Sequence, residues 1–384
     1  MKFTLNTHVA LAVFSQALKT CNTKSKGQPD SEFLFEKDGD KLTVTSLNEI
    51  SEQCISVPTV SLTGDDEKFS VAGAAVVEFL RQISDSEVAC GYSTKNNAFV
   101  MATTDPSKQT KFAFPVGDPT DFIPIQFKSI GVEFDISGEA FSNALKCTAF
   151  AAATDGSQTP QTAVRMRVYG EMLVAEASDY HRISMYTSDI EEVDIDNSFL
   201  LRKDVAETLS SLLVDLDSVK VVRADNHIRF IWGDTVFTSV LESEIKKKFA
   251  PVSKFFSGKL LGEAKLSRGE LQRALKLASL IAKESSVGVA LDGSHIVITT
   301  NEDGKGISKD TVITQTCDGE ASTYSAWKYL VKAVDTAFSP WITMEFRELP
   351  NAAGVALVII DEGYQHLIFP VLPKANDATD DATP

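Results

Sequence analysis

The sequence predicts an α+β protein made of three repeated domains, each with two helices plus antiparallel strands. Three observations carry this prediction. A short helical phrase recurs three times at nearly equal spacing, each third of the chain holds a second amphipathic helix, and short alternating strands with tight turns lie between them. The chain has 384 residues, which is roughly two to three times a typical single domain, so more than one hydrophobic core is expected.

The repeated phrase centres on the tripeptide Ala-Leu-Lys, which ends at Lys19, Lys146 and Lys276, at intervals of 127 and 130 residues. Its flanks also match, because each copy follows a short extended segment, at residues 2–5, 133–136 and 264–266. Ser137 and Ser267 stand where helix N-caps belong. Matching flanks at near-equal spacing indicate an internal repeat rather than a chance recurrence.

The remaining elements complete each repeat. Second helices are expected at residues 74–83, 204–213 and 326–338, and three consecutive strands at 219–242, with turns at Asp225-Asn226 and Gly233-Asp234. Hairpins are expected at 287–300 and 355–371, about Asp292-Gly293-Ser294 and Glu362-Gly363. The predicted domain limits are 1–128 for the first domain, 129–250 for the second, 251–264 for a connector, 265–373 for the third and 374–384 for an acidic tail.

The composition is that of a soluble globular protein, with 43% hydrophobic and 23% charged residues. The five cysteines are scattered, which favours reduced thiols and a cytoplasmic location, and argues against a disulfide framework or a zinc site. The apolar run near the N-terminus is short, and no stretch approaches the roughly 18 apolar residues of a membrane span. The sequence therefore predicts no membrane association.

The charge distribution matters more than the net charge of −16. Residues 7–26 carry a net charge of +3, and residues 267–284 and 325–334 carry +2 each, while the other three helices are near neutral and the strands and loops hold the acidic excess. For one helix, the simpler interpretation is that lysines solvate an exposed face. For the set, a basic helical surface on an acidic protein favours an electrostatic track for a polyanion.

An enzyme built on Asp179, His181 and Arg182 is the first functional alternative. A hydrolase needs a nucleophile oriented by a base and an oxyanion site, and no G-x-S-x-G, H-E-x-x-H or P-loop pattern is present. The remaining histidines are isolated along the chain. We therefore expect no catalysis, no cofactor and no metal site.

The most specific motif is Ala-Ser-Asp-Tyr-His-Arg-Ile at residues 177–183, which follows Val168-Tyr169-Gly170 and a strand over 172–175. It resembles the A-T-D-G-H-R-L signature of the bacterial DNA sliding-clamp family, the beta subunit of DNA polymerase III. The resemblance extends to the opening at residues 1–4, to Arg165 five residues before Gly170, to residues 329–334, which resemble the family's Y-L-x-x-A-L helix, and to the ending at 368–373, which resembles V-M-P-M-R-L.

The resemblance implies a head-to-tail homodimer closed into a ring of six clamp-type domains, with helices lining the hole and strands forming the outer wall. Such a clamp, or processivity factor, would encircle duplex DNA without reading its sequence, since phosphate contacts carry no sequence information. It would tether the replicative polymerase, and its implied protein partners are the DNA polymerase III alpha subunit, the clamp loader and other proteins with clamp-binding linear motifs. It would have no catalytic activity of its own.

The resemblance also assigns site residues by position. Lys24, Arg202, Arg273, Lys276 and Lys332 are expected to face DNA, and Phe112 of one subunit is expected to pack against Leu280 and Ile281 of the other. The pocket for partner peptides is expected to comprise Val168, Ser178, Tyr180, His181, Arg182, Ile183, Leu367, Phe369, Pro370, Val371 and Leu372. For Ile183, Leu367 and Phe369 the alternative is a plain core role, and for Leu367 the two interpretations are evenly matched.

The chain departs from the family pattern at several of these places. Tyr180 replaces a glycine, Leu372-Pro373 replaces a terminal arginine and leucine, the F-P-D-Y phrase expected near residues 245–251 is absent, and Ala326 stands near the position of an asparagine. These departures leave partner specificity open, as well as the choice among a divergent chromosomal clamp, a paralogue and a phage or plasmid copy. A clamp-like scaffold or decoy that does not load on DNA is the second functional alternative.

Overall fold

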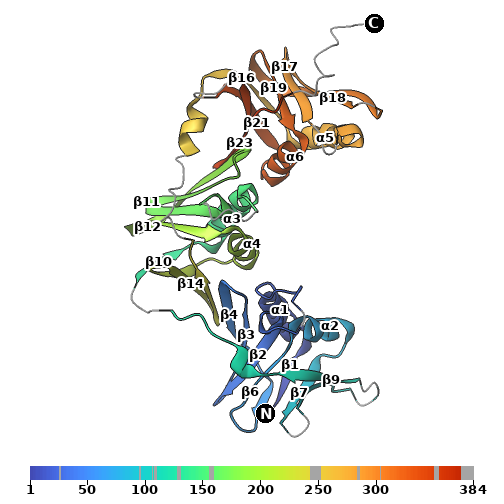
Figure 1. Ribbon diagram of the computed structural model, residues 1–384, viewed down its shortest axis with the longest axis vertical. Coiled ribbons are helices and arrows are strands. Elements are labelled where there is room, and N and C mark those ends of the chain that lie inside the picture. The colour runs from blue at the N-terminus through green and yellow to red at the C-terminus, as the bar shows by residue number, and fades with distance from the viewer. Residues whose placement is uncertain are drawn as a thin grey trace. The chain divides into compact units, whose positions relative to one another are not determined.

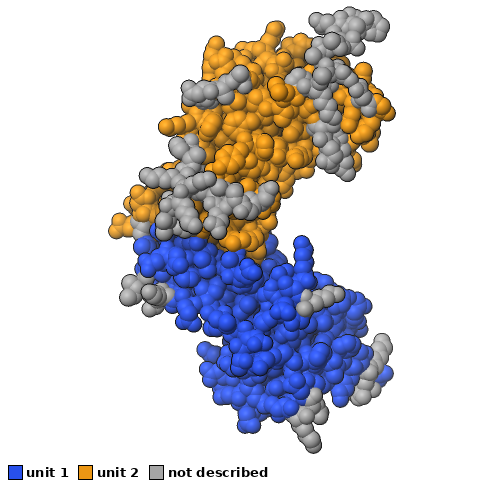
Figure 2. Space-filling view, in the orientation of Figure 1, with its two compact units in different colours: residues 1–139, 211–241 blue, residues 140–210, 242–384 orange. Residues whose placement is uncertain are grey.

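The computed structural model describes residues 1–25, 27–94, 97–105, 107, 110–127, 131–154, 160–242, 252–282, 286–302, 304–349 and 354–372. The chain forms two compact units (Figure 2). Unit 1 comprises Met1–Glu139 and Ser211–Leu241, and unit 2 comprises Ala140–Ser210 and Glu242–Pro384. The predicted second domain contributes to both units. Its limits at residues 129 and 250, and the acidic tail at 374–384, lie outside the described residues, so the domain limits stay predictions.

The described residues contain two α-helices in each third of the chain (Figure 1). The midway helices begin and end within one or two residues of the predicted limits, which is the ordinary uncertainty at helix ends. The repeated phrase lies on the first helix of each pair, as predicted. The helices are α1 (Thr7–Leu18), α2 (Gly73–Gln82), α3 (Gly138–Thr148), α4 (Lys203–Leu212), α5 (Arg268–Ala282) and α6 (Trp327–Thr336).

A strand directly precedes each repeated helix: β1 (Lys2–Asn6), β10 (Val132–Ile136) and β16 (Leu260–Ser267). The side chain of Asn6 caps α1 by accepting hydrogen bonds from the backbone N–H groups of the first helical turn, at 3.1 and 3.2 Å. Ser267 Oγ accepts the N–H of Glu270 at 3.4 Å, which confirms its predicted cap at α5. Strand β16 begins at Leu260, inside the stretch predicted as a connector.

Unit 1 is organised around one antiparallel sheet. Its other strands are β2 (Glu32–Asp38), β3 (Lys41–Leu47), β4 (Ser51–Ser56), β5 (Ser61–Thr63), β6 (Lys68–Ala72), β7 (Glu87–Ser93), β8 (Ala98–Thr103), β9 (Lys111–Gly117), β13 (Val219–Ala224), β14 (His227–Trp232) and β15 (Thr235–Val240). The strand order is β10-β13-β14-β15-β4-β3-β2-β6-β9-β8-β7-β1-β5. Strands β13 to β15 and their turns confirm the prediction for this segment.

The sheet of unit 1 joins two thirds of the chain, because β15 pairs with β4 and sets Phe237 opposite Gln53. Its core is rich in aromatic side chains. Phe35 stacks on Phe69 with ring centroids 5.2 Å apart, and Phe14 of α1 meets Phe35 edge-on at 5.4 Å. The helical phrase is thus held against the sheet by its apolar face.

Unit 2 is organised around a second antiparallel sheet. Its other strands are β11 (Ala163–Ser178), β12 (Arg182–Arg202), β17 (Ser286–Asp292), β18 (His295–Glu302), β19 (Gly306–Gly319), β20 (Ala321–Ala326), β21 (Trp341–Glu348), β22 (Val355–Asp361) and β23 (Tyr364–Ile368). The strand order is β11-β12-β23-β22-β21-β16-β19-β18-β17-β20. Both predicted hairpins are present, and the second ends at Ile368 rather than at residue 371.

The antiparallel pairing of β12 with β23 positions the candidate site. Ile183 of the second third lies opposite Leu367 of the last third in this pairing. Short 3-10 helices flank the strands at η1 (Pro29–Ser31), η2 (Pro119–Asp121), η3 (Ala149–Ala151), η4 (Pro160–Thr162) and η5 (Val252–Ser257). No described helix has both the length and the apolar character needed to cross a membrane. The fold confirms the predicted combination of paired helices and antiparallel strands.

Candidate functional site

The motif at residues 177–183 forms the end of β11, a tight turn and the start of β12. Asp179 Oδ1 accepts the backbone N–H groups of His181 and Arg182 at 3.1 and 3.2 Å. Ser178 Oγ donates to the carbonyl oxygen of Arg182 at 2.9 Å, and the N–H of Phe369 donates to the carbonyl oxygen of His181 at 3.0 Å. The short polar side chains therefore satisfy backbone hydrogen-bonding groups of the turn. A backbone hydrogen bond also fixes the chain after β23 beside it.

Tyr180 occupies the apex of this turn with a φ of +69°, and 65% of the residue is exposed. A positive φ favours glycine, which the resemblance expects here, and a residue with a Cβ pays a strain of about 1 kcal/mol or more. The backbone geometry of the turn is thus one that suits glycine, although the residue is tyrosine. The ring is open to solvent and available to a partner.

Arg182 connects the turn to the helices of unit 2. Its Nε donates to Asp179 Oδ2 at 2.9 Å, and its Nη2 donates to the carbonyl oxygen of Phe150 at 2.6 Å. The guanidinium carbon lies 4.5 Å from the ring centroid of Tyr329 on α6 and 5.3 Å from that of Phe150. The hydrogen bonds and the cation–π contacts together hold the guanidinium in one position.

The residues predicted to form the peptide pocket divide into a buried set and an exposed set. Val168, Ile183 and Leu367 have at most 1% of their surface exposed. Ile183 and Leu367 belong to one core cluster, with the partly buried Phe255 of η5 and Phe369 packed against it. For Ile183 and Leu367 this burial fits the core alternative, and a peptide would meet them only beneath other side chains.

Exposure increases toward the last described residues. Phe369, Pro370 and Val371 are partly exposed, and Leu372 is 92% exposed. The rings of Phe255 and Phe369 meet edge to face with centroids 5.6 Å apart. A peptide at this place would therefore contact the rim formed by Phe369 to Leu372 first. The assignment of the pocket as a whole stays a prediction.

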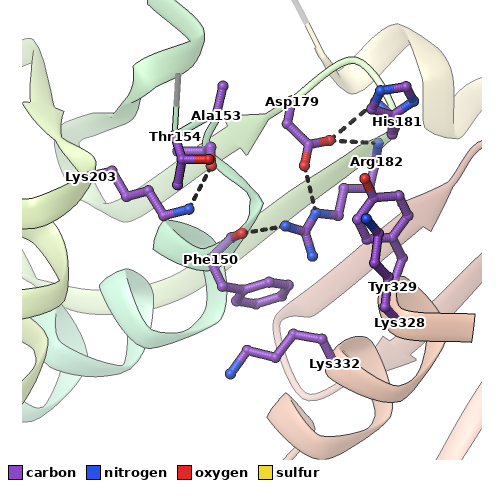
Figure 3. Close-up of a pocket in the computed structure, with 11 residues that line it drawn as sticks. Phe150, Ala153, Thr154, Asp179, His181, Arg182, Lys203, Lys328, Tyr329 and Lys332 are labelled. Atoms are coloured by element: carbon purple, nitrogen blue, oxygen red, sulfur yellow. Dashed lines mark hydrogen bonds and ion pairs between the residues drawn. The ribbon is translucent and has the colours of Figure 1, made fainter. Parts of the chain in front are cut away.

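A cavity of about 660 Å³ opens beside Arg182, and all of its lining residues belong to unit 2 (Figure 3). They come from η3 and the residues after it, from the β11–β12 turn, from the start of α4 and from α6. Four of them are cations, Arg182, Lys203, Lys328 and Lys332, and one is a carboxylate, Asp179. We call this site the cationic cavity.

The lysines of the cationic cavity contact carbonyls and rings rather than carboxylates. Lys203 Nζ donates to the carbonyl oxygen of Ala152 at 2.9 Å, and its pKa is lowered by burial and further by Arg182, against an opposing effect of Glu207. The Nζ atoms of Lys328 and Lys332 lie 5.0 and 5.2 Å from the ring centroids of Tyr329 and Phe150. None of the three forms an ion pair with a carboxylate in the described part of the chain.

The sequence placed His181, Arg182 and Lys332 of this cavity among functional residues but missed the rest. Lys328 and Lys332 are four residues apart, so one face of α6 carries both, and this signal was available. Phe150 and Lys203 gave no signal, because the cavity is assembled from segments that are distant in the chain. No group of three or more metal-binding side chains occurs among the residues that the structure describes.

The five residues predicted to contact DNA have different surroundings. Lys24 in unit 1 is exposed, and Arg202 pairs with Asp204 at 3.4 Å. Lys276 lines a separate cavity of about 360 Å³ between α5 and α6, and Lys332 lines the cationic cavity. Arg273 of α5 donates to the carboxylates of Glu270 at 3.0 Å and Asp310 at 2.9 Å. Their role toward DNA stays a prediction.

The residues predicted at the subunit contact are available on the surface. Phe112 on β9 is exposed, and its ring lies 4.7 Å from that of Phe114. On α5, Leu280 is exposed and Ile281 is partly exposed. These apolar side chains are therefore accessible to a partner chain. The subunit contact itself stays a prediction.

Comparison with known proteins extends these observations. The family model of the central domain of the DNA polymerase III beta subunit matches residues 135–244. The beta sliding clamp of Haemophilus influenzae is 20% identical over 305 residues, covering 78% of this chain and 81% of that protein. The beta sliding clamp of Staphylococcus aureus is 21% identical over 321 residues, covering 81% and 83%.

Solved structures resemble the whole chain. The DNA polymerase III beta subunit of Thermotoga maritima has a TM-score of 0.86 at 18% identity, covering 97% of this chain and 100% of that one. The DNA polymerase sliding clamp of Bacillus subtilis has a TM-score of 0.82 at 17% identity, with the same coverage. At these identities the structural likeness shows the fold, which is that of sliding clamps.

Proposed function

We propose that this chain is a divergent member of the bacterial DNA sliding-clamp family, a processivity factor that encircles duplex DNA. The observation that carries the proposal is the likeness to clamp structures over 97% of the chain, together with the family model at residues 135–244. On this proposal the chain tethers the replicative polymerase and other clamp-binding proteins, and catalyses no reaction itself.

The physical basis of the proposal is the separation of charge. Basic stretches accompany three of the helices, while the protein as a whole carries −16. Basic side chains facing a hole attract phosphates without reading bases, and an acidic exterior discourages binding from the side. Retention on DNA then comes from the closed ring rather than from high affinity, which permits sliding.

We propose a head-to-tail homodimer, because one chain has three repeats and a six-domain ring needs two chains. A head-to-tail contact closes into a ring when its rotation allows. Phe112 of one subunit would pack against Leu280 and Ile281 of the other. The proposed location is the cytoplasm, and the proposed partners are the DNA polymerase III alpha subunit, the clamp loader and other proteins with clamp-binding motifs.

The experiment that tests encirclement compares circular with linearised DNA. Clamp loaded onto a nicked plasmid is expected to stay bound through a high-salt wash, and to be lost when one restriction cut opens the plasmid. Salt suppresses electrostatic contacts but leaves a topological link intact. Equal loss from both forms of DNA would contradict the proposal and favour a clamp-like scaffold that does not load.

A further inference from the structure

The cationic cavity differs from a surface on which lysines are merely solvated. Arg182 already has a carboxylate partner in Asp179, so the lining charge without an ionic partner comes from Lys203, Lys328 and Lys332. Lys203 is partly buried, where a charge is costly unless it is compensated. Three lysines line one cavity in an acidic protein, and this arrangement favours an anion with more than one charge.

We propose that the cationic cavity is a binding site for a phosphate group. Its volume of about 660 Å³ lies within the range of small-molecule sites and admits a pyrophosphate or the phosphates of a nucleotide. A dianion in this cavity would compensate the charge of the partly buried Lys203. Such a site does not require ring closure, because every lining residue lies in unit 2.

The free donors of the cavity suit a phosphate. The planar fork of arginine matches carboxylate and phosphate alike, but in this cavity that fork is already turned to Asp179 and to the carbonyl of Phe150. The remaining donors are lysines, which act as point charges with three protons each and suit the several oxygens of a tetrahedral phosphate.

Base recognition is not part of the proposal, because the aromatic faces are occupied. Arg182 and Lys328 lie over the ring of Tyr329, while Arg182 and Lys332 lie over that of Phe150. The rings therefore hold the cations in place rather than offer a platform for stacking a base. The phosphate can come from two sources, a free di- or triphosphate or the backbone of DNA.

The first test is titration calorimetry of the full-length protein with inorganic pyrophosphate. One pyrophosphate per chain is expected, and Lys203→Gln and Lys332→Gln are each expected to weaken it about tenfold or more, since each removes a charge-assisted hydrogen bond. Lys309→Gln, at an exposed position of β19 outside the cavity, is the matched control with the same change of charge. No binding to the parent, or an equal loss in the control, would overturn the proposal.

The second test identifies the source by displacement of bound pyrophosphate. Displacement by a short single-stranded oligonucleotide of any base composition would assign the backbone of DNA, and displacement by a nucleoside triphosphate alone would assign a free phosphate. Stronger displacement by an aspartate-rich peptide of equal charge would overturn the phosphate assignment. Retention on circular DNA is measured separately, so failure of this site and failure of the clamp function are distinguishable.

Discussion

Helices α5 and α6 pack together in unit 2, and the stretches that contain them each carry a net charge of +2, yet they present that charge differently. The indole N–H of Trp327 on α6 donates to the carbonyl oxygen of Leu275 on α5 at 2.8 Å, and Gln272 of α5 donates to Asp335 of α6 at 2.8 Å. On α5 one cation, Arg273, is paired with two carboxylates, whereas both lysines of α6 line the cationic cavity without a carboxylate partner among the described residues.

On α5, the guanidinium of Arg273 donates to Glu270 at 3.0 Å and to Asp310 of β19 at 2.9 Å. The same helix exposes Leu277 and Leu280 to solvent. On α6, no described carboxylate pairs with Lys328 or Lys332. We conclude that α5 is suited to an apolar protein contact and α6 to an anion, although their net charges are equal.

The largest expected effect is at α5. Leu280→Asp is expected to convert the dimer to monomer, because the substitution would bury an unpaired carboxylate at the subunit contact, at a cost of about 3 kcal/mol or more. That cost corresponds to a dissociation constant more than 100-fold higher. Light scattering over a dilution series measures it. Ile281→Asp is expected to act in the same direction.

The control for this prediction is Ile123→Asp. Ile123 is 79% exposed and Leu280 is 78% exposed, so neither substitution disturbs packing within the chain. The control is expected to remain dimeric. If Leu280→Asp also remained dimeric, the contact would lie elsewhere and α5 would lose its assigned role.

The second-largest effect is expected on peptide binding at the predicted pocket that contains Phe369, which lies on neither α5 nor α6. Phe369→Ala is expected to weaken a polymerase-derived peptide by roughly 1–3 kcal/mol if Phe369 is an anchor. Tyr180→Gly is expected to strengthen it, since the large exposed side chain would narrow one side of the predicted peptide pocket and its positive φ suits glycine.

Calorimetry measures both variants, and the dimer mass serves as the control because neither residue lies at the predicted contact. Unchanged affinity in Phe369→Ala would place the anchor elsewhere. No binding to either the parent or Tyr180→Gly would contradict the role as a peptide hub.

The comparison of α5 with α6 also shows which features could be predicted from the sequence and which could not. The repeat of the Ala-Leu-Lys phrase predicted three helix pairs, and alternating strands with Gly and Asn turns predicted the hairpins, because both are local patterns. Pairing of Arg273 with Asp310 was not predictable, since it depends on how α5 packs against β19. The cationic cavity was missed for the same reason, as Phe150, Lys203 and Lys328 meet only in the folded unit.

A smaller effect is expected from His366 beneath α6. Its ring is fully buried, stacks on Phe150 with centroids 5.2 Å apart, and has no hydrogen-bond partner among the described residues. Burial holds the pKa of His366 well below its usual value, and Arg182 adds to this effect. The folded protein therefore keeps His366 neutral at a pH at which the unfolded chain would protonate it.

The direction of the pH dependence of stability follows from this difference in protonation between the folded and unfolded chain. The stabilising contribution is full above about pH 6.5, the value for an unfolded histidine, and is lost as the pH falls below it. At pH 5.5 the loss is about 1.4 kcal/mol in the free energy of unfolding. We expect urea unfolding, measured at pH 5.5 and above pH 6.5, to show a flatter pH dependence of the free energy of unfolding in His366→Leu than in the parent. His8→Leu, at an exposed position, is the control, and equal slopes in all three proteins would contradict the prediction.

The smallest effect tests the comparison directly, by removing one charge from each helix. Lys332→Gln is expected to reduce the salt dependence of binding to a short duplex by about one unit of slope, because each lysine that neutralises a phosphate releases roughly one counterion. Arg273→Gln is expected to change the slope much less, since two carboxylates already neutralise that guanidinium. Fluorescence anisotropy at several salt concentrations measures both slopes. The losses are expected to be equal for duplexes of unrelated sequence, because phosphate contacts do not read bases. A larger change in Arg273→Gln than in Lys332→Gln would mean that Arg273 leaves Glu270 and Asp310 to meet DNA, and the distinction between α5 and α6 would fail.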